Sequence, residues 1–250
     1  MATESVGEQI RTVLCFAAHP DDIDFGAAGT IASWTARGVS VTYCIMTDGD
    51  AGGFSEDHRA DIVERRREEQ RNAARLVGVR DVQFLGEPDG NLQPTAEVIR
   101  EVVRQIRRVR PDVVLSMHPE RSWERIQKSH PDHLACGEAV TQAVYPAAEN
   151  PYAFPELLAE GLEAFKVPWL WFYGSPARLE NHSVDITGFE DRKLEAIRFH
   201  ASQHPDLARM DSRVRGMLLA NAERVGLPAG HSAELFHAVP VNTEQTIAGF

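Results

Sequence analysis

The feature of this sequence that most constrains its fold is the alternation, through its first half, of short apolar runs with longer segments that carry helical signals. The apolar runs predict strands, and the intervening segments predict helices because they show helical spacing of apolar residues or end at glycine or proline. In chain order we expect strands and helices alternately at 13–18, 24–37, 39–46, 58–77, 82–85, 95–109 and 113–117. Strands that alternate with helices form βαβ units with right-handed crossovers. The expected fold is therefore α/β: a Rossmann-like, doubly wound, mostly parallel sheet with helices on both faces.

The second half of the chain is less regular and predicts fewer elements. The segment VPWLWFYG at 167–174 indicates a strand, and residues 189–203 indicate a helix. The proline-rich stretch YPAAENPYAFPE is interpreted as an excursion within the fold and not as a domain boundary. The 250 residues are enough for one large core, so the sequence predicts a single domain over residues 1–250.

Charge and hydropathy exclude several classes of partner. The formal net charge of −11 argues against nucleic acid, because phosphate binding needs a basic surface. No apolar stretch approaches the ~20 residues of a membrane-spanning helix, and the N-terminal segment MATESVGEQIR lacks the features of a signal peptide. The widely spaced Cys15, Cys44 and Cys136 indicate buried free thiols. We expect a cytoplasmic protein with a small-molecule partner, and the sequence leaves homo-oligomerisation open.

Two short motifs concentrate histidine and carboxylate side chains where strands are expected to end. The segment HPDD, from His19 to Asp22, follows the first predicted strand, and HPDH, from His130 to His133, follows the fourth and begins a helix. Ligands of parallel sheets bind at the carboxyl ends of the strands, so both motifs belong to the same edge. Each motif offers two side chains at positions i and i+3, which share one face of a helical turn.

This combination is typical of a catalytic zinc site. Three ligands drawn from histidine and carboxylate, with one open position, are the usual donors of such a site. The ion would acidify a water molecule for attack on a substrate. The alternative is that both motifs are only helix starts, because aspartate is a common N-cap and proline favours the first turn. The presence of two such motifs at one sheet edge favours the metal site.

Three further segments carry residues that could serve a function. The triplet His204-Pro205-Asp206 has no second histidine or acid at i+3, so we interpret it as a helix start and expect no catalytic role for His204. His118 ends the fourth predicted strand at the same edge, and its approach to the site stays open. The segment Gly26-Ala-Ala-Gly29 lacks the spacing of a dinucleotide-binding loop and the lysine of a P-loop.

The order of the motifs along the chain resembles that of the PIG-L/LmbE deacetylase superfamily. The resemblance runs from about residue 12 to residue 204 and rests on AHPDD, GAAGT, RRREE, LVGV, PDG, PDVVLS, HPDH and HASQ. The superfamily includes N-acetylglucosaminyl-phosphatidylinositol (GlcNAc-PI) deacetylases and the mycothiol-pathway deacetylase. One departure is Ile23, which stands where many members have glutamate, with Asp24 in the place that the acid takes in variants of the motif. This departure weakens any transfer of substrate identity.

The resemblance implies a role for each residue of the two motifs. It implies that His19, Asp22 and His133 are the ligands of one zinc ion (Zn²⁺) per chain. It further implies that Asp21 is the general base that activates water. His130 would stabilise the oxyanion or protonate the leaving amine.

Substrate contacts are implied for two further residues. Arg66, which with Glu69 matches an R-x-x-E motif, would face the substrate, and Asp89 of PDG would touch its hydroxyl groups. The expected function is a zinc-dependent hydrolase, an N-deacetylase or amidase, that removes an N-acyl group, in first place acetyl, from an amino sugar or related amine through a metal-activated water. One alternative is a phosphoesterase that uses Mg²⁺, although two histidines disfavour that ion. The other is a non-catalytic sugar-binding module.

Overall fold

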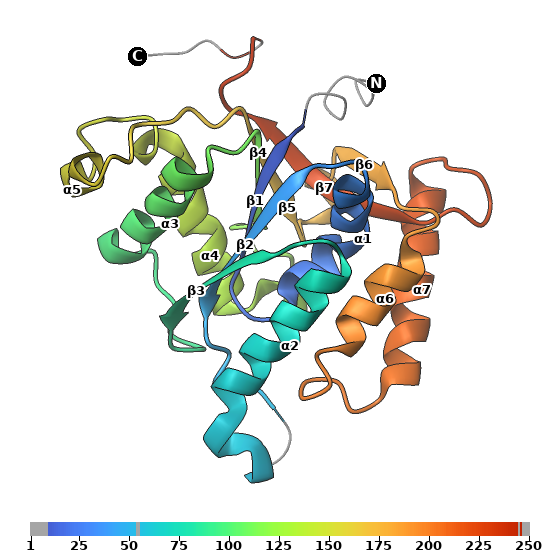
Figure 1. Ribbon diagram of the computed structural model, residues 1–250. Helices are drawn as coiled ribbons and strands as arrows, with labels where there is room; N and C mark the ends of the chain where they lie inside the picture. Colours follow the sequence, from blue (N-terminus) through green and yellow to red (C-terminus); the bar gives the residue numbers. More distant parts are fainter. Residues whose placement is uncertain (1–9, 54–55, 245, 247–250) are drawn as a thin grey trace.

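The computed structural model describes residues 10–53, 56–244 and 246, and within these residues seven strands form one sheet (Figure 1). The strand order is β3-β2-β1-β4-β5-β7-β6. The strands are β1 (Thr12–Ala17), β2 (Ser40–Thr47), β3 (Asp81–Glu87), β4 (Val113–Met117), β5 (Trp169–Tyr173), β6 (His182–Asp185) and β7 (Ala233–Pro240). The first five pair in parallel, whereas β7 is antiparallel to both β5 and β6. The mostly parallel sheet predicted from the sequence is confirmed.

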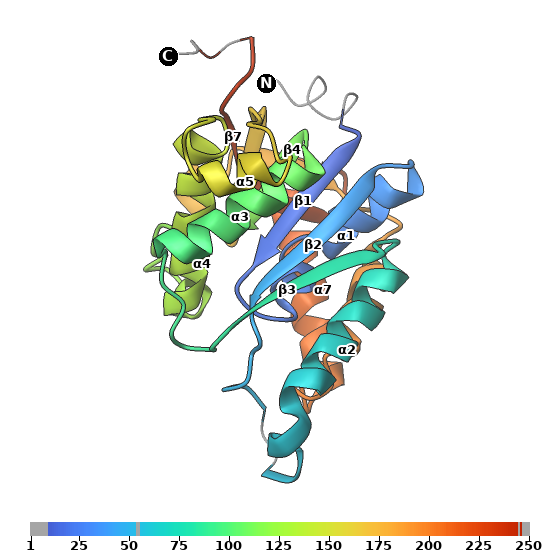
Figure 2. The same ribbon diagram turned by 60° about the vertical axis from the view of Figure 1, so that its left-hand side comes forward.

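Helices cover both faces of the sheet (Figures 1 and 2). One face carries α1 (Asp22–Ala36), α2 (Ile62–Leu76), α6 (Glu190–Arg198) and α7 (Leu207–Arg224), and the other carries α3 (Ala96–Val109), α4 (Pro131–Gln142) and α5 (Pro155–Ala159). The doubly wound arrangement is confirmed. Within the described residues, no helix combines the length and apolarity that crossing a membrane requires. Most of the N-terminal segment that was examined for a signal peptide, residues 1–9, lies outside the described residues.

The predicted elements of the first half are present, with shifts at their ends. Helix α1 begins at Asp22, two residues before the predicted start, and the predicted helix at 58–77 divides into a 3-10 turn, Glu56–Asp61, and α2. In the second half the predicted helix at 189–203 ends at Arg198, the helix start predicted at 204–206 leads into α7, and α5, β6 and β7 were not predicted. The three cysteines are buried free thiols, as expected.

Two glycines allow α1 to pack closely against its neighbours. A Cβ atom on Gly26 would overlap the ring of Tyr173, and one on Gly29 would overlap the side chain of Ile186. Tyr173 also donates its hydroxyl hydrogen to the carbonyl oxygen of Phe16 at 2.9 Å. The segment Gly26-Ala-Ala-Gly29 is therefore a packing motif, which lets α1 lie close to Tyr173 and Ile186.

A buried ion pair ties α1 to the C-terminal part of the chain. Lys193 of α6 lies with its Nζ 2.6 Å from Oε1 of Glu234 on β7, and both side chains are almost fully enclosed. Lys193 also donates to two backbone carbonyls of α1, and Glu234 accepts from two of its backbone N–H groups. Removing one partner of such a pair leaves an uncompensated buried charge. We call Lys193 and Glu234 the charge anchor of α1.

Candidate active site

The two motifs meet at the carboxyl edge of the parallel strands, as predicted. HPDD leads from β1 into α1, and HPDH leads into α4. The ring centroid of His19 lies 5.0 Å from that of His130 and 5.3 Å from that of His133, and the latter two are 5.4 Å apart. Three imidazoles from two distant segments therefore face one small volume.

Asp22 connects the histidines of the two motifs. Its Oδ2 lies 3.4 Å from Nδ1 of His19, and its Oδ1 lies 3.2 Å from Nε2 of His133. His133 donates from Nδ1 to the carbonyl oxygen of Lys128 at 3.1 Å. This hydrogen bond fixes the orientation of the ring and places Nε2 toward Asp22, which is how a metal-binding histidine is usually held by its second partner.

A second pair of carboxylates faces the other nitrogen of His19. Its Nε2 lies 3.0 Å from Oδ1 of Asp89 and 3.2 Å from Oδ2 of Asp132. Asp132 is fully buried and also accepts the backbone N–H groups of Gly90 at 2.7 Å and Leu92 at 3.2 Å. It therefore holds the turn that carries Asp89. The sequence analysis assigns no role to Asp132, although it is the third residue of HPDH.

These carboxylates favour positive charge at the centre of the cluster. Burial lowers the pKa of His19, but its contacts with Asp132, Asp22 and Asp89 outweigh burial and raise that pKa to about 12. Burial raises the pKa of Asp22, whereas the adjacent His133 and His19 hold it well below its usual range. A divalent cation would satisfy the same carboxylates. Imidazole nitrogen together with carboxylate oxygen is a donor set that suits Zn²⁺, so the residues fit the implied metal.

Among the residues that the structure describes, two groups of three side chains could hold a metal ion with ligand atoms within 4.8 Å of one another. These groups are His19, His130 and His133, and His19, Asp89 and Asp132. Asp22, a member of the predicted ligand set, contacts His19 and His133 but belongs to neither group. The structure thus brings the three predicted ligands together, and it also presents His130 as a competitor of Asp22.

Asp21 adopts a strained backbone conformation beside this cluster. Its φ is 104°, in the left-handed region that residues other than glycine rarely adopt. Its N–H donates to Oε1 of Gln70 at 2.9 Å, and its Oδ2 lies 3.5 Å from Nη2 of Arg66 and 3.7 Å from Nε2 of His204. Strain of this kind persists only where the surroundings enforce it, and it is common at functional sites. Asp22 faces the histidine cluster, whereas Asp21 faces Arg66.

Arg66 is enclosed by protein and is only 3% exposed. It donates to the carbonyl oxygens of Gly49 at 2.8 Å and Pro20 at 2.6 Å, and its Nη1 lies 3.9 Å from Oδ2 of Asp89. A Cβ atom on Gly49 would overlap the guanidinium, which explains the glycine in the loop after β2. Arg66 therefore joins the segments that carry Asp21 and Asp89.

His130 is placed to donate a hydrogen bond. Its Nδ1 accepts from the backbone N–H of Asp132 at 3.3 Å, so the neutral imidazole carries its proton on Nε2. Burial and the neighbouring His19 and His133 lower the pKa of His130, which favours this neutral form.

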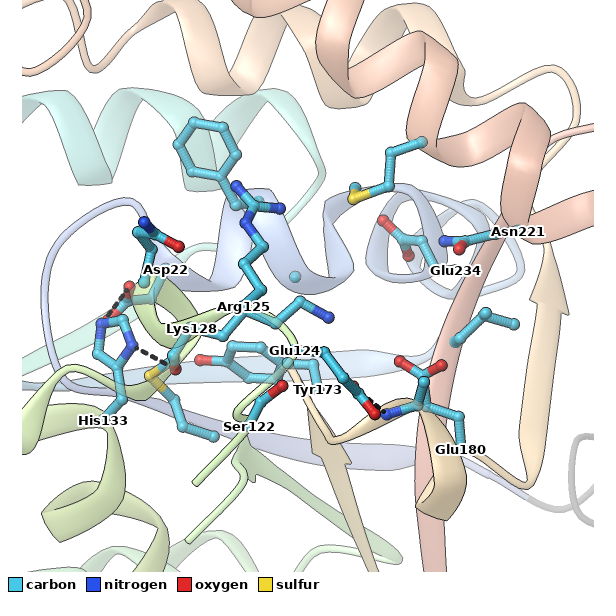
Figure 3. A pocket seen from close by; sticks show the side chains of 18 of the residues that line it. Asp22, Ser122, Glu124, Arg125, Lys128, His133, Tyr173, Glu180, Asn221 and Glu234 are labelled. Carbon is cyan, nitrogen blue, oxygen red and sulfur yellow. Dashed lines mark hydrogen bonds and ion pairs between the residues drawn. The ribbon is translucent and has the colours of Figure 1, made fainter. Parts of the chain in front are cut away.

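A cavity of about 460 Å³ adjoins the cluster (Figure 3). Asp22 and His133 line one end of it, and Glu180, Asn221 and Glu234 line the other. Its volume lies within the usual range of small-molecule sites.

His204 and His118 make contacts that the sequence did not predict. Asp206 is the N-cap of α7 and accepts from the N–H of Arg209 at 3.0 Å, so the predicted helix start is confirmed. His204 of the same triplet nevertheless turns toward Asp21. His118 pairs with His237, Nε2 to Nδ1, at 3.0 Å, and it belongs to neither group of candidate metal ligands in the described part of the chain.

Known proteins match this chain in sequence. The PIG-L family model, described as GlcNAc-PI de-N-acetylase, matches residues 14–144. The diacetylchitobiose deacetylase of Thermococcus kodakarensis is 35% identical over 200 residues, which cover 79% of this chain and 72% of that protein. A probable N-acetyl-alpha-D-glucosaminyl L-malate deacetylase 2 of Bacillus anthracis is 30% identical over 201 residues, 77% of this chain and 81% of that protein.

The fold matches as well. The structure of N,N'-diacetylchitobiose deacetylase from Pyrococcus horikoshii, in complex with an inhibitor, has a TM-score of 0.86 and 30% identity to this chain. The match covers 95% of this chain and 87% of that one. These relatives are deacetylases, which hydrolyse amide bonds. The chain belongs to the PIG-L family of deacetylases and is a hydrolase of amide bonds.

Proposed function

We propose that this protein is a zinc-dependent N-deacetylase that removes the acetyl group from the N-acetylglucosamine unit of a small-molecule substrate. The observation that carries the proposal is the different surroundings of two adjacent carboxylates. Asp22 joins His19 and His133, while Asp21 lies beside that cluster without joining it. The names of the relatives support the substrate class, since each describes an N-acetylated glucosamine with a different attached group.

Each residue near the cluster has a distinct task in this proposal. His19, Asp22 and His133 would hold the ion, which when bound would supply a Lewis acid for the water and the amide carbonyl. Asp21 accepts the proton of the attacking water. His130 donates from Nε2 to the carbonyl oxygen as negative charge develops there, which is stabilising because the donor is already in position. Asp21 then returns that proton to the departing amine.

The remainder of the substrate is assigned to the cavity that adjoins the cluster. The cavity begins at Asp22 and His133, so a group attached to the glucosamine can enter it while the amide lies at the ion. Segment 122–128 contributes several of the lining residues, among them Arg125 and Lys128, whose side chains extend across the cavity in Figure 3.

The test of this function is amine release from diacetylchitobiose, N-acetylglucosaminyl malate and free N-acetylglucosamine, with zinc-loaded and chelator-treated protein. We expect zinc-dependent release, and a higher kcat/KM for the two larger substrates because they also fill the cavity. Release of inorganic phosphate from a monoester with Mg²⁺, without amide hydrolysis, would favour the phosphoesterase. Sugar binding without any turnover would favour the non-catalytic module.

Asp89→Ala is expected to affect substrate recognition more than the chemical step. A carboxylate accepts hydrogen bonds from sugar hydroxyls, and losing a charged hydrogen bond reduces kcat/KM by roughly 10- to 100-fold. The measurement compares kcat/KM on the best of the three N-acetylglucosamine substrates with kcat/KM on a minimal N-acetyl amine. The zinc content of the variant is measured alongside. Zinc is expected to remain. Equal losses on the two substrates would argue against a recognition role.

Arg66→Ala supplies a useful contrast. The sequence predicts the same role for Arg66 as for Asp89, but its guanidinium donates to backbone carbonyls of the protein. We therefore expect Arg66→Ala to lower kcat/KM on both substrates alike, through the placement of Asp21 and Asp89. A decrease in kcat/KM on the sugar substrate alone would instead indicate that Arg66 contacts the substrate directly.

A further inference from the structure

The triplet His204-Pro205-Asp206 contributes more than a helix start. Its histidine lies in the turn between α6 and α7, at the same end of the molecule as the carboxyl edge of the parallel strands (Figure 1). Nε2 of His204 is 3.7 Å from Oδ2 of Asp21. The atom is buried, and it has no hydrogen-bond partner among the described residues.

Three sets of contacts hold the turn that carries His204. Its ring meets the ring of Phe25 at 4.9 Å between centroids, edge to face. Before it, Ser202 donates its N–H and hydroxyl hydrogens to Glu69 of α2 at 3.0 and 2.7 Å. Two residues after it in the chain, Asp206 caps α7. The ring is therefore directed at Asp21 by packing and by hydrogen bonds that do not involve Asp21.

The carboxylate of Asp21 depends on such neighbours for its orientation. Within the described part of the chain it accepts no hydrogen bond, and the two groups that face its Oδ2 are Arg66 at 3.5 Å and His204 at 3.7 Å. Arg66 donates one hydrogen bond from each Nη atom to the carbonyls of Gly49 and Pro20, and these bonds hold its guanidinium against the backbone. A ring nitrogen with no other partner is thus the group best able to fix this oxygen.

We infer that His204 is a positioning residue for Asp21, and this inference rests on the proposed function. The Nε2–H group of His204 holds Oδ2 of Asp21, which leaves Oδ1 to receive the proton of the attacking water. Catalytic hydrogen bonds are often long before substrate binds and shorten in the complex, so a separation of 3.7 Å fits this role.

The inference is tested with two substitutions that separate the donor from the ring. His204→Phe keeps a ring against Phe25 but removes the N–H group, whereas His204→Gln offers an amide N–H at a similar distance from the backbone. We expect His204→Phe to lose roughly 10- to 100-fold in kcat through misplacement of the base. KM should change by less than about twofold, and zinc content should not change. His204→Gln should recover most of the lost kcat.

A double-mutant cycle with Asp21→Asn identifies the residue through which His204 acts. When the carboxylate is already gone, His204→Phe should cause no further loss, since coupled residues are not additive. Asp206→Ala is the matched control, because it removes the cap of the same triplet. It should lower the melting temperature by a few degrees, and its loss of kcat should be much smaller than that of His204→Phe, because the N–H group of His204 is still present.

Three results would overturn the inference while the deacetylase activity stands. They are full kcat in His204→Phe, equal losses in His204→Phe and His204→Gln, and an undiminished loss in the Asp21→Asn background. The failure of the proposed function looks different. An inactive zinc-loaded wild type, or an Asp21→Asn protein with full kcat, would overturn that function and the inference together.

Discussion

Asp21→Asn is expected to keep its zinc and to lose roughly 10²–10⁴ in kcat, the usual scale for a missing general base. Asp22→Asn is expected to lose zinc, because a neutral amide oxygen is a poorer ligand than a carboxylate. The two substitutions make the same chemical change at adjacent positions, so each is the control for the other. The expected asymmetry follows from the contacts: Asp22 touches both His19 and His133, and Asp21 touches neither.

Two measurements decide this prediction. Elemental analysis gives the zinc content of both variants, and steady-state kinetics gives kcat as a function of pH. The acidic limb of the pH–rate profile should vanish in Asp21→Asn, since the carboxylate whose protonation stops the reaction is gone. If both variants retain zinc and activity, these side chains only start a helix. If Asp21→Asn loses the metal instead, the two roles are exchanged.

His133→Ala is expected to purify with little zinc and to have the residual activity of chelator-treated protein, because two remaining ligands hold zinc weakly. His130→Ala is the matched variant, since it removes the other imidazole of HPDH, three residues away. It should keep about one zinc per chain and lose roughly 10²–10³ in kcat, the usual scale for an oxyanion donor.

Together with Asp22→Asn, this pair of variants tests the proposed ligand set against the set of three histidines. Full zinc occupancy in His133→Ala would exclude the proposed set of His19, Asp22 and His133. Loss of zinc from His130→Ala, together with its retention in Asp22→Asn, would assign the ion to the three histidines. The separation of those rings, 5.0 to 5.4 Å between centroids, makes this a real competitor.

The first half of the fold could be predicted because strands buried on both faces must be continuous apolar runs. Residues 13–17 are fully buried, and the sequence shows that run directly. Strands β6 and β7 carry no such signal. β6 is a short, half-exposed edge strand, and β7 places a buried glutamate, Glu234, inside its apolar run. A buried glutamate is acceptable only once Lys193 lies beside it, and the sequence does not show that contact.

The same limit applies to the site. The HPDD and HPDH motifs predict that histidines and carboxylates meet, because both follow strands of one parallel sheet. Contacts between different motifs were not predicted. Asp132 accepts a hydrogen bond from the turn that carries Asp89, and Arg66 donates one to the loop after β2. His204 shows why. The N-cap signal of its triplet is local and correct, but the direction of its ring depends on how the turn between α6 and α7 packs.

The charge anchor has a consequence for how the protein is made. Every proposed zinc ligand has been synthesised once the ribosome reaches His133, but Glu234 follows roughly a hundred residues later, on the order of 5–20 s of elongation. Lys193 follows first and Glu234 last, so until β7 is made α1 lacks the complete set of contacts that the charge anchor provides. We therefore expect metal loading with the proposed coordination to require the finished polypeptide, after β7 has entered the sheet.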